Sequence, residues 1–551
     1  MSNRVKISKK PGNAKLQAVR RARIEQALGQ GDIEGAASLA EAALAAGQEE
    51  PMLLNLAAWR REEAGDFAGA HRFLPRALAL APGDVMVLGA IGAVLRKEGR
   101  LDEALALLDR VLAAAPGHSA AWLERGYTME HLKSEQGADE SFRRAIAIDP
   151  NMAPALGKLA DAAARKGDRE AAGNFASRAL AVDPLEPSAN FALATVELEA
   201  READKAEARL RRLLECRLKS DDRIRSLTLL GDALDRLDRR GEAFDSWSEA
   251  QRLFRSEFEA IFAPTADRPG HRRFIEIITE QVERAPAFAP APAEPVPGEA
   301  AIHVFLLGYP RSGTTLVENV LASAPGTIAL EERETFAQID PVLLPNSGLM
   351  PDFDALDPGL GGELRARYWN QVERLAGESA GGRTFVDMNP FNGVKLPVIA
   401  RLFPKARILI MRRDPRDVVL SCFRINFVAS PGTFALSELE EAARHYEAMM
   451  RLTELCRERL PLAFHEVRYD RLVADFECEV RAMAEFVGLE WTDEFRSFDK
   501  TARTRGVRTA SATQVRQGLY DGGGKWRRYA AQLAPVLPIL KPWVERFGFE
   551  P

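Results

Sequence analysis

A 34-residue period constrains the fold of the first half of this chain. Prolines recur at this interval, and a new helical pattern follows each one. The four prolines are Pro82, Pro116, Pro150 and Pro184. Two series of small residues share the grid: Ala36, Ala70, Ala104, Ala138, Ala172 and Ala206, and then Ala58, Gly92, Gly126, Ala160 and Ala194. A series of large apolar residues completes it: Leu44, Leu78, Leu112, Ile146 and Leu180.

Each series has a physical use in a stack of helical hairpins. Small residues let the two helices of a hairpin cross closely, and a large apolar residue fills the groove between hairpins. Proline can start a helix because its missing N–H would be unpaired there. The grid therefore predicts an α-superhelix over residues 20–260.

This order of small, large and proline positions resembles the tetratricopeptide repeat. The resemblance implies a concave groove that takes an extended peptide or another protein. The alternative is a scaffold that only shapes or dimerises the molecule. Oligomeric state is left open, with a homodimer as one option.

Composition excludes several classes of function. The chain has 551 residues, enough for two to four domains, and its net charge of −5 indicates neither a nucleic-acid nor an anionic-membrane partner. A basic segment, residues 1–19, lacks the apolar core of a signal peptide, and no stretch approaches the length of a membrane span. The four cysteines lack CxxC spacing, so neither a disulfide framework nor a zinc site is indicated. These features predict a cytoplasmic protein without a metal.

A connecting segment and a second domain follow the repeats. The 34-residue period lapses over residues 261–299, and the Pro/Ala-rich stretch 285–298 is typical of a semi-rigid spacer. The second domain is predicted for residues 300–551. Short apolar runs alternate with helical patterns there, which favours an α/β fold with a mainly parallel sheet. The runs lie at residues 302–307, 383–387, 407–411 and 462–469.

The first of these strands leads into a phosphate-loop-like sequence, GYPRSGTT, and then an amphipathic helix. Backbone amides and the N-terminus of the helix make an anion site in this arrangement. ATP and GTP enzymes place a lysine after the second glycine to reach the β and γ phosphates, but this chain has Thr314. A loop with Arg311 and two threonines is suited to one tetrahedral anion rather than to a triphosphate and its metal.

The stretch YPRSGTTLVENVLASAPG resembles the 5′-phosphosulfate loop of sulfotransferases that use 3′-phosphoadenosine 5′-phosphosulfate (PAPS). More narrowly, residues 300–545 resemble tyrosylprotein sulfotransferases and bacterial sulfotransferases fused to tetratricopeptide repeats. The resemblance implies PAPS as donor and 3′,5′-diphosphoadenosine (PAP) as product. It also implies that the loop holds the 5′ side of the donor through Arg311, Ser312, Gly313, Thr314 and Thr315.

A second motif, RILIMRRDPRDVVLSCF, predicts a strand that ends in two arginines and a helix started by Asp414 and Pro415. Two arginines and a helical hydroxyl can grip a phosphate dianion. The alternative is a solvated basic turn. The resemblance assigns the donor's 3′-phosphate to Arg413 and Ser421.

The resemblance also implies a catalytic base and three further donor contacts. Glu332 lies 21 residues after Arg311, where the family has the carboxylate that takes the acceptor's proton. Glu331 and Glu334 are its rivals, and acids at a helix start more often compensate the dipole. The donor contacts are Tyr469, Ser511 and Lys525. An ordinary strand-end aromatic is the alternative role for Tyr469.

One position departs from the family. Relatives have a lysine two residues before the proline of a DxxPF-like stretch, and this chain has Met388. Loss of a cation aimed at developing negative charge raises the barrier. Either Lys395, Arg412 or Arg413 substitutes, or turnover is slow, or the domain binds without reacting.

The motifs together predict a PAPS-dependent sulfotransferase that modifies an acceptor hydroxyl, with a polypeptide such as a tyrosine-containing one favoured by the repeat array. A carbohydrate or small-molecule acceptor remains open. The rival functions are a repeat-based adaptor with a weak or inactive transferase domain and an ATP-dependent kinase-like enzyme.

Overall fold

The computed structural model describes residues 11–286, 294–353, 358–505, 518–519 and 522–550. Its packing divides the chain into two compact units. The first runs to Ala163 and also takes Glu170–Ala192, and the second comprises Ala164–Arg169 and the chain from Leu193 onward. The predicted domain boundaries at 260 and 300 stay predictions.

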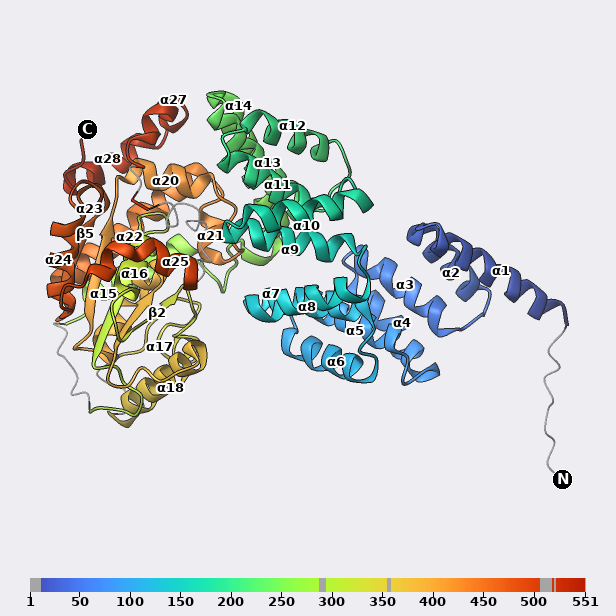
Figure 1. The fold of residues 1–551 in the computed structure, drawn as a ribbon. Coiled ribbons are helices and arrows are strands. Elements are labelled where there is room, and N and C mark those ends of the chain that lie inside the picture. The colour runs from blue at the N-terminus through green and yellow to red at the C-terminus, as the bar shows by residue number, and fades with distance from the viewer. Residues whose placement is uncertain (1–10, 287–293, 354–357, 506–517, 520–521, 551) are drawn as a thin grey trace. The chain divides into compact units, whose positions relative to one another are not determined.

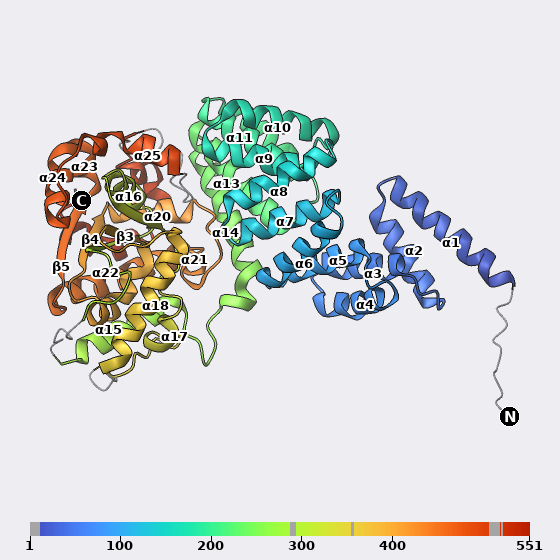
Figure 2. The same cartoon turned by 60° about the horizontal axis from the view of Figure 1, so that its bottom comes forward.

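The first unit is a stack of helical hairpins, each helix packing on its neighbour in the chain (Figures 1 and 2). Its helices are α1 (Pro11–Gly29), α2 (Ile33–Ala45), α3 (Pro51–Glu63), α4 (Phe67–Leu80), α5 (Val85–Lys97), α6 (Leu101–Ala114), α7 (Ser119–His131) and α8 (Glu135–Ile148). Helices α9 (Ala153–Lys166), α10 (Arg169–Val182) and α11 (Pro187–Glu199) continue the series. The first helices of successive hairpins start 34 residues apart, so the predicted repeat is confirmed.

The small positions work as predicted. A Cβ at Gly126 would lie 2.4 Å from the Phe142 ring of the facing helix. A Cβ at Gly92 would lie 2.9 Å from Leu108. Only glycine therefore allows these helix pairs to approach so closely.

The predicted role of the prolines was wrong by three residues. Pro82 follows the end of α4 and precedes Val85, the first residue of α5. Proline is common just after a helix because it cannot continue it. The next helix is instead started by Asp84, whose carboxylate accepts hydrogen bonds from the amides of Met86 and Val87.

The second unit begins with the last helices of the array and continues into an α/β domain. Helices α12 (Ala203–Leu214), α13 (Ser220–Arg236) and α14 (Arg240–Phe262) come first. Helix α15 (His271–Arg284), inside the predicted connecting segment, packs on α22 (Leu439–Arg459). Part of the Pro/Ala-rich stretch, residues 287–293, lies outside the described residues.

The sheet has five parallel strands in the order β2-β3-β1-β4-β5. They are β1 (Ile302–Leu307), β2 (Thr327–Glu331), β3 (Thr384–Met388), β4 (Arg407–Arg412) and β5 (Ala463–Arg468). The predicted parallel α/β fold is confirmed, and β2 is the strand that the predicted runs omitted. The order reverses at β1 and β4, so the carboxyl ends of these two strands form the switch point where ligands bind in open α/β sheets.

Alternate residues of each strand enter different cores. Val304 and Leu306 of β1 pack with α16 (Thr314–Ala322) and α24 (Phe476–Val487). His303 and Phe305 lie on the other face, against an aromatic cluster that includes Tyr368 of α18 (Pro358–Ala376).

Short helices complete the domain. They are α17 (Asp340–Leu343), η1 (Pro390–Lys395), α19 (Leu396–Leu402), α20 (Pro415–Phe423), α21 (Pro431–Ala435), α23 (Tyr469–Ala474), η2 (Asp493–Ser497), α25 (Phe498–Arg505), η3 (Lys525–Tyr529), α27 (Ala530–Leu533) and α28 (Leu537–Arg546). Within the described ranges, each helix is too short or too polar to cross a membrane. A search of those same ranges finds no group of three metal-ligating side chains.

Candidate functional site

The loop between β1 and α16 is built for close backbone approach. Gly313 has φ 112° and Arg311 has φ 71°, so the chain turns through left-handed conformations before the helix. A Cβ at Gly313 would lie 2.8 Å from the Tyr469 ring, and one at Gly308 would lie 2.7 Å from Ser312 Oγ. Both positions therefore require glycine.

The loop is closed by its own hydrogen bonds. The Ser312 amide donates to the Tyr309 carbonyl at 3.0 Å, and the Tyr309 amide donates to Ser312 Oγ at 3.3 Å. Thr314 and Thr315 form the first turn of α16, where amides without helical partners and the helix dipole favour an anion.

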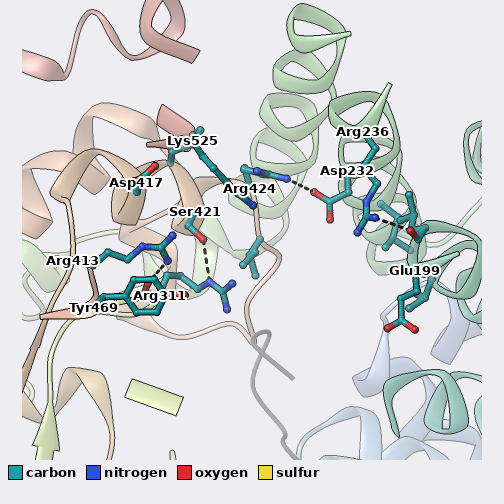
Figure 3. A pocket seen from close by; sticks show the side chains of 15 residues that line it. Glu199, Asp232, Arg236, Arg311, Arg413, Asp417, Ser421, Arg424, Tyr469 and Lys525 are labelled. Carbon is teal, nitrogen blue, oxygen red and sulfur yellow. Dashed lines mark hydrogen bonds and ion pairs between the residues drawn. The ribbon is translucent and has the colours of Figure 1, made fainter. Parts of the chain in front are cut away.

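The end of β4 faces this loop across the switch point. Asp414 caps α20 by accepting a hydrogen bond from the Arg416 amide at 2.9 Å, and Pro415 is the first helical residue. The helix carries Ser421, whose Oγ accepts a hydrogen bond from Arg311 Nε at 3.1 Å (Figure 3). The structure therefore joins the two sequence motifs directly.

Arg413 is half-buried beside this pair. It donates to the carbonyls of Arg311 at 3.0 Å and Gly522 at 2.7 Å, and its guanidinium lies 4.8 Å from the Tyr469 ring centroid. Its Nε is buried with no hydrogen-bond partner in the described part of the chain. Such an unsatisfied charged donor in a cavity is suited to an anion.

The electrostatics of Arg311 fit the same role. Burial, together with the neighbouring charge of Arg413, lowers the pKa of Arg311 to about 10. The side chain still carries its charge near neutral pH. A bound anion would relieve the repulsion between the two guanidinium groups.

The C-terminal segment reaches the site through Asp417 of α20. Its two carboxylate oxygens accept hydrogen bonds from the amides of Gly524 at 2.7 Å and Trp526 at 2.8 Å. The Arg416 guanidinium lies 3.9 Å from the Trp526 ring centroid. These contacts fix Lys525, the residue between them, at the cavity.

A cavity of about 270 Å³ collects these side chains (Figure 3). The α/β domain contributes Arg311, Arg413, Asp417, Leu420, Ser421, Arg424, Ile425, Tyr469 and Lys525. Helices α11 and α13 contribute Thr195, Leu198, Glu199, Leu229, Asp232 and Arg236. Five of the predicted site residues, drawn from four separate motifs, thus line one cavity.

Glu332 lies outside the lining of this cavity, just after β2. Its backbone has φ 47°, and its amide donates to the Met388 carbonyl at 2.7 Å. The side chain is exposed, and its charge acts on Arg311, so the two groups are near one another. Thr335, three residues on, donates to the fully buried Asp387 at 2.7 Å and anchors the loop.

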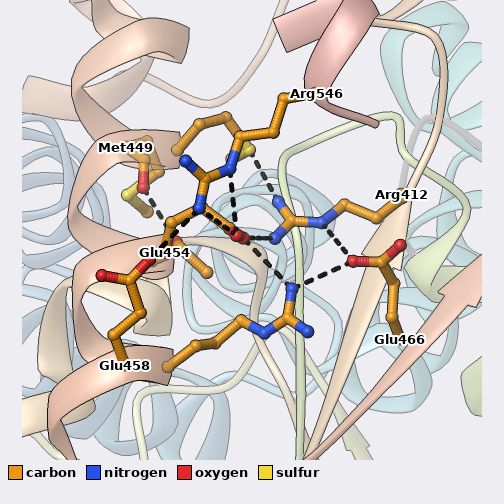
Figure 4. A network of polar contacts seen from close by, with 9 residues as sticks. Arg412, Met449, Glu454, Glu458, Glu466 and Arg546 are labelled. Carbon is orange, nitrogen blue, oxygen red and sulfur yellow. Dashed lines mark hydrogen bonds and ion pairs between the residues drawn. The ribbon is translucent and has the colours of Figure 1, made fainter. Parts of the chain in front are cut away.

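Of the two arginines at the end of β4, Arg412 does not line the cavity. Its side chain is buried in an ion network with Glu454 and Glu466, and its guanidinium lies 4.2 Å from the Phe547 ring centroid (Figure 4). Arg546 of α28 joins the same network through Glu454 at 3.0 Å. Successive residues of a strand point to opposite faces, so Arg412 and Arg413 separate.

Lys395, which was also proposed to replace the missing lysine, lies away from the cavity. Lys395 pairs with Asp340 at 2.8 Å and lies 4.8 Å from the Phe336 ring centroid. Met388 is fully buried in the core under α16. Of Lys395, Arg412 and Arg413, only Arg413 lines the cavity.

Sequence reasoning missed Asp417 and Arg424. With Ser421 they occupy spacings of four and three residues along α20, so they share one helix face, and this periodicity could have revealed them. Nothing in the sequence pointed to Asp232 or Arg236 of the array. Ser511 lies outside the described residues.

Comparisons with known proteins agree with this arrangement. Residues 303–493 match a model of the sulfotransferase family, and residues 62–124 match the tetratricopeptide repeat. An uncharacterised Aquifex aeolicus protein is 29% identical over 442 residues, which are 76% of this chain and 54% of that protein. Protein-tyrosine sulfotransferase A of Caenorhabditis elegans is 24% identical over 261 residues, which are 45% of this chain and 67% of the nematode protein.

Among solved structures, a thermophilic tetratricopeptide-repeat protein of Thermus thermophilus is 21% identical, with a TM-score of 0.29 over 33% of this chain and 98% of its own. A TM-score this low carries no argument about the fold. The chain spans about half the length of the Aquifex relative. Its tetratricopeptide repeats are followed by residues that match the sulfotransferase family model, and the proteins similar to it include protein-tyrosine sulfotransferases.

Proposed function

We propose that this protein transfers a sulfuryl group from PAPS to an acceptor hydroxyl, and that the repeat array recruits a polypeptide bearing it. The observation that carries the proposal is the pairing of Arg311 with Ser421 beside Arg413 and Lys525, which joins the motifs for both ends of the donor in one cavity. The family match and the similarity to protein-tyrosine sulfotransferases support the chemistry.

The residues around the cavity fit a nucleotide with separate 5′ and 3′ charges. The loop amides and the two threonines would hold the 5′ phosphosulfate, and Arg413 with Ser421 would hold the 3′-phosphate. The unsatisfied Nε of Arg413 supports this fit. The donor supplies an electrophilic sulfur and a phosphate leaving group.

Glu332 is the proposed base. It takes the proton of the acceptor hydroxyl as the oxygen bonds to sulfur and the bond from sulfur to the bridging phosphate oxygen breaks. Negative charge then collects on the 5′-phosphate of PAP, and Arg311 stabilises it. The backbone hydrogen bond from Glu332 to Met388 and the contact between Thr335 and Asp387 hold the loop that carries the Glu332 carboxylate.

The ATP-dependent alternative is disfavoured by Asp387. This carboxylate would have to hold magnesium, yet it is fully buried and accepts hydrogen bonds from Tyr368 at 2.6 Å and Thr335 at 2.7 Å. Burial raises its pKa to about 6, as expected of a structural acid rather than a metal ligand.

The inactive-adaptor alternative is favoured by Met388 alone. Its buried side chain leaves the leaving-group oxygen without the lysine that relatives use. Transfer activity distinguishes the two functions, because an adaptor releases no sulfuryl group.

The test is transfer of radiolabelled sulfate from PAPS to polypeptides of a whole-cell extract. We expect labelled acceptors with the wild-type protein. Glu332→Gln should lower the rate by about 10²- to 10⁴-fold with PAP affinity unchanged, since general-base catalysis contributes that factor. Glu334→Gln, an exposed neighbour two residues away, is the matched control and should retain full activity.

Full activity of Glu332→Gln would remove the base assignment. Absence of labelling by the wild-type protein, with partners still captured by the array, would overturn the transferase in favour of the adaptor.

A further inference from the structure

The candidate site has a wall that the sulfotransferase-family match does not cover. That match begins at residue 303, whereas Leu229, Asp232 and Arg236 of α13 line the cavity. They belong to the same compact unit as the α/β domain. Figure 3 shows Asp232 directed at Arg424, with Arg311 and Ser421 on the α/β side of the cavity.

Asp235, one helical turn from Asp232, lies behind this wall and does not itself line the cavity. It is 8% exposed. Its carboxylate accepts a hydrogen bond from the Tyr529 hydroxyl at 2.7 Å and forms ion pairs with Arg528 at 2.9 Å and Arg424 at 3.1 Å. One carboxylate therefore engages three side chains from two distant segments.

Both segments deliver cavity residues. Arg424 follows α20, three residues after Ser421, and Tyr529 and Arg528 end the η3 turn that starts at Lys525. Displacement of either segment would move a hydroxyl or an ammonium out of the cavity. Asp235 contacts neither Ser421 nor Lys525, so its influence on them is indirect.

Further contacts hold α13 and α14 on the same two segments. Gln251 of α14 donates to the carbonyls of Phe423 at 2.7 Å and Ile425 at 3.0 Å. The Arg424 guanidinium lies 4.2 Å from the Trp247 ring centroid, and the Trp247 and Tyr529 rings are 5.5 Å apart. A buried network of hydrogen bonds, ion pairs and ring contacts of this kind favours a single arrangement.

We propose that the last helical hairpin of the array, α13–α14, is a built-in part of the nucleotide site, with Asp235 as its positioning residue. Through Arg424 and the η3 turn, Asp235 sets where Ser421 and Lys525 stand. The identity of the nucleotide rests on the proposed function, whereas the positioning of the two segments does not.

The experiment uses the full chain and three variants. Asp235→Asn removes the charge, and Tyr529→Phe removes one hydrogen bond while keeping the ring on Trp247. Glu242→Gln is the matched control, because Glu242 lies on α14 and pairs with Arg239 and with Arg211 of α12, outside both segments. Hydrogen exchange of residues 413–424 and 522–529 is measured without ligand, and PAP affinity is measured by calorimetry.

We expect Asp235→Asn to speed exchange in both segments and to weaken PAP binding about ten-fold, as loss of hydrogen bonds to a charged group implies. The donor KM should rise while kcat changes by less than about two-fold, because Asp235 touches no reacting atom. Tyr529→Phe should also speed exchange and weaken PAP binding, with a change in binding free energy about one third as large as that of Asp235→Asn. Glu242→Gln should match the wild type.

Wild-type exchange and PAP affinity in Asp235→Asn would overturn the proposal, as would equal effects from Glu242→Gln. If Asp235→Asn does not fold, Tyr529→Phe decides by the same criteria. If the wild-type protein binds no PAP, the proposed function fails, and the exchange measurement alone decides the positioning role.

Discussion

Arg412 and Arg413 are neighbours in the chain and have opposite surroundings. Arg412 lies buried in an ion network with Glu454 and Glu466. Arg413 faces the cavity, where within the described ranges it donates hydrogen bonds to two backbone carbonyls and forms no ion pair, although Asp417 is near enough for their charges to interact. Each guanidinium lies over an aromatic ring, 4.2 Å from the centroid of Phe547 for Arg412 and 4.8 Å from that of Tyr469 for Arg413. The two arginines therefore differ in their ion pairs with carboxylates and not in their contacts with aromatic rings.

The contrast separates a structural charge from a binding charge. Carboxylates compensate Arg412 within the fold, so its removal takes a buried cation out of an established ion network. Backbone carbonyls only partly compensate Arg413, which leaves its guanidinium suited to a ligand anion. The same residue type at one strand end thus stabilises the protein in one position and is suited to bind in the next.

The largest expected effect is on stability. Arg412→Ala should lower the free energy of unfolding of the second unit by about 3–5 kcal/mol, because it removes two hydrogen bonds to charged groups, Glu454 and Glu466, each worth about 1.5–3 kcal/mol. Urea denaturation followed by circular dichroism measures it. A change below about 1 kcal/mol would erase the distinction between the two arginines.

The next effect is on binding. Arg413→Ala should weaken PAP binding about ten- to hundred-fold, since hydrogen bonds to charged groups are worth about 1.5–3 kcal/mol. The unfolding midpoint should stay near that of the wild type. Calorimetry and denaturation of the same sample measure both. Loss of stability without loss of affinity would reverse the roles given to Arg412 and Arg413.

The smallest effect concerns the rings. Tyr469→Leu should weaken PAP binding by about two- to five-fold through loss of a cation–π contact worth about 0.5–1 kcal/mol. Phe547→Leu is the matched change on the other arginine. It should lower the free energy of unfolding and leave PAP affinity unchanged. Equal effects of both variants on affinity would show that stacking, and not the absence of carboxylates, defines the site.

Local sequence was enough for the repeats and the phosphate loop. The 34-residue period predicted the helical hairpins, because a small residue in one helix packs against a large side chain of the facing helix, as Gly126 packs against Phe142. Gly308 and Gly313 marked the loop for the same reason. Arg413 and Ser421, which line the cavity, could be singled out because strand end and helix start are contiguous in the chain.

What was missed depends on three-dimensional geometry that local sequence patterns encode only in part. The two-residue alternation of a strand could have separated Arg412 from Arg413 as replacements for the missing lysine, but both were kept as candidates. The pairing of Asp235 with Tyr529 joins positions 294 residues apart, and no local pattern encodes it. Acids on a helix of the array are by default solvated or paired within it, so α13 gave no signal of a site.

The most direct test of the central claim is a calorimetric titration of the full-length protein with PAP and, separately, with ATP and magnesium. A donor site at Arg311 of the loop and at Arg413 predicts saturable heat with PAP and none with ATP and magnesium. Tight binding of ATP with no heat from PAP would contradict it.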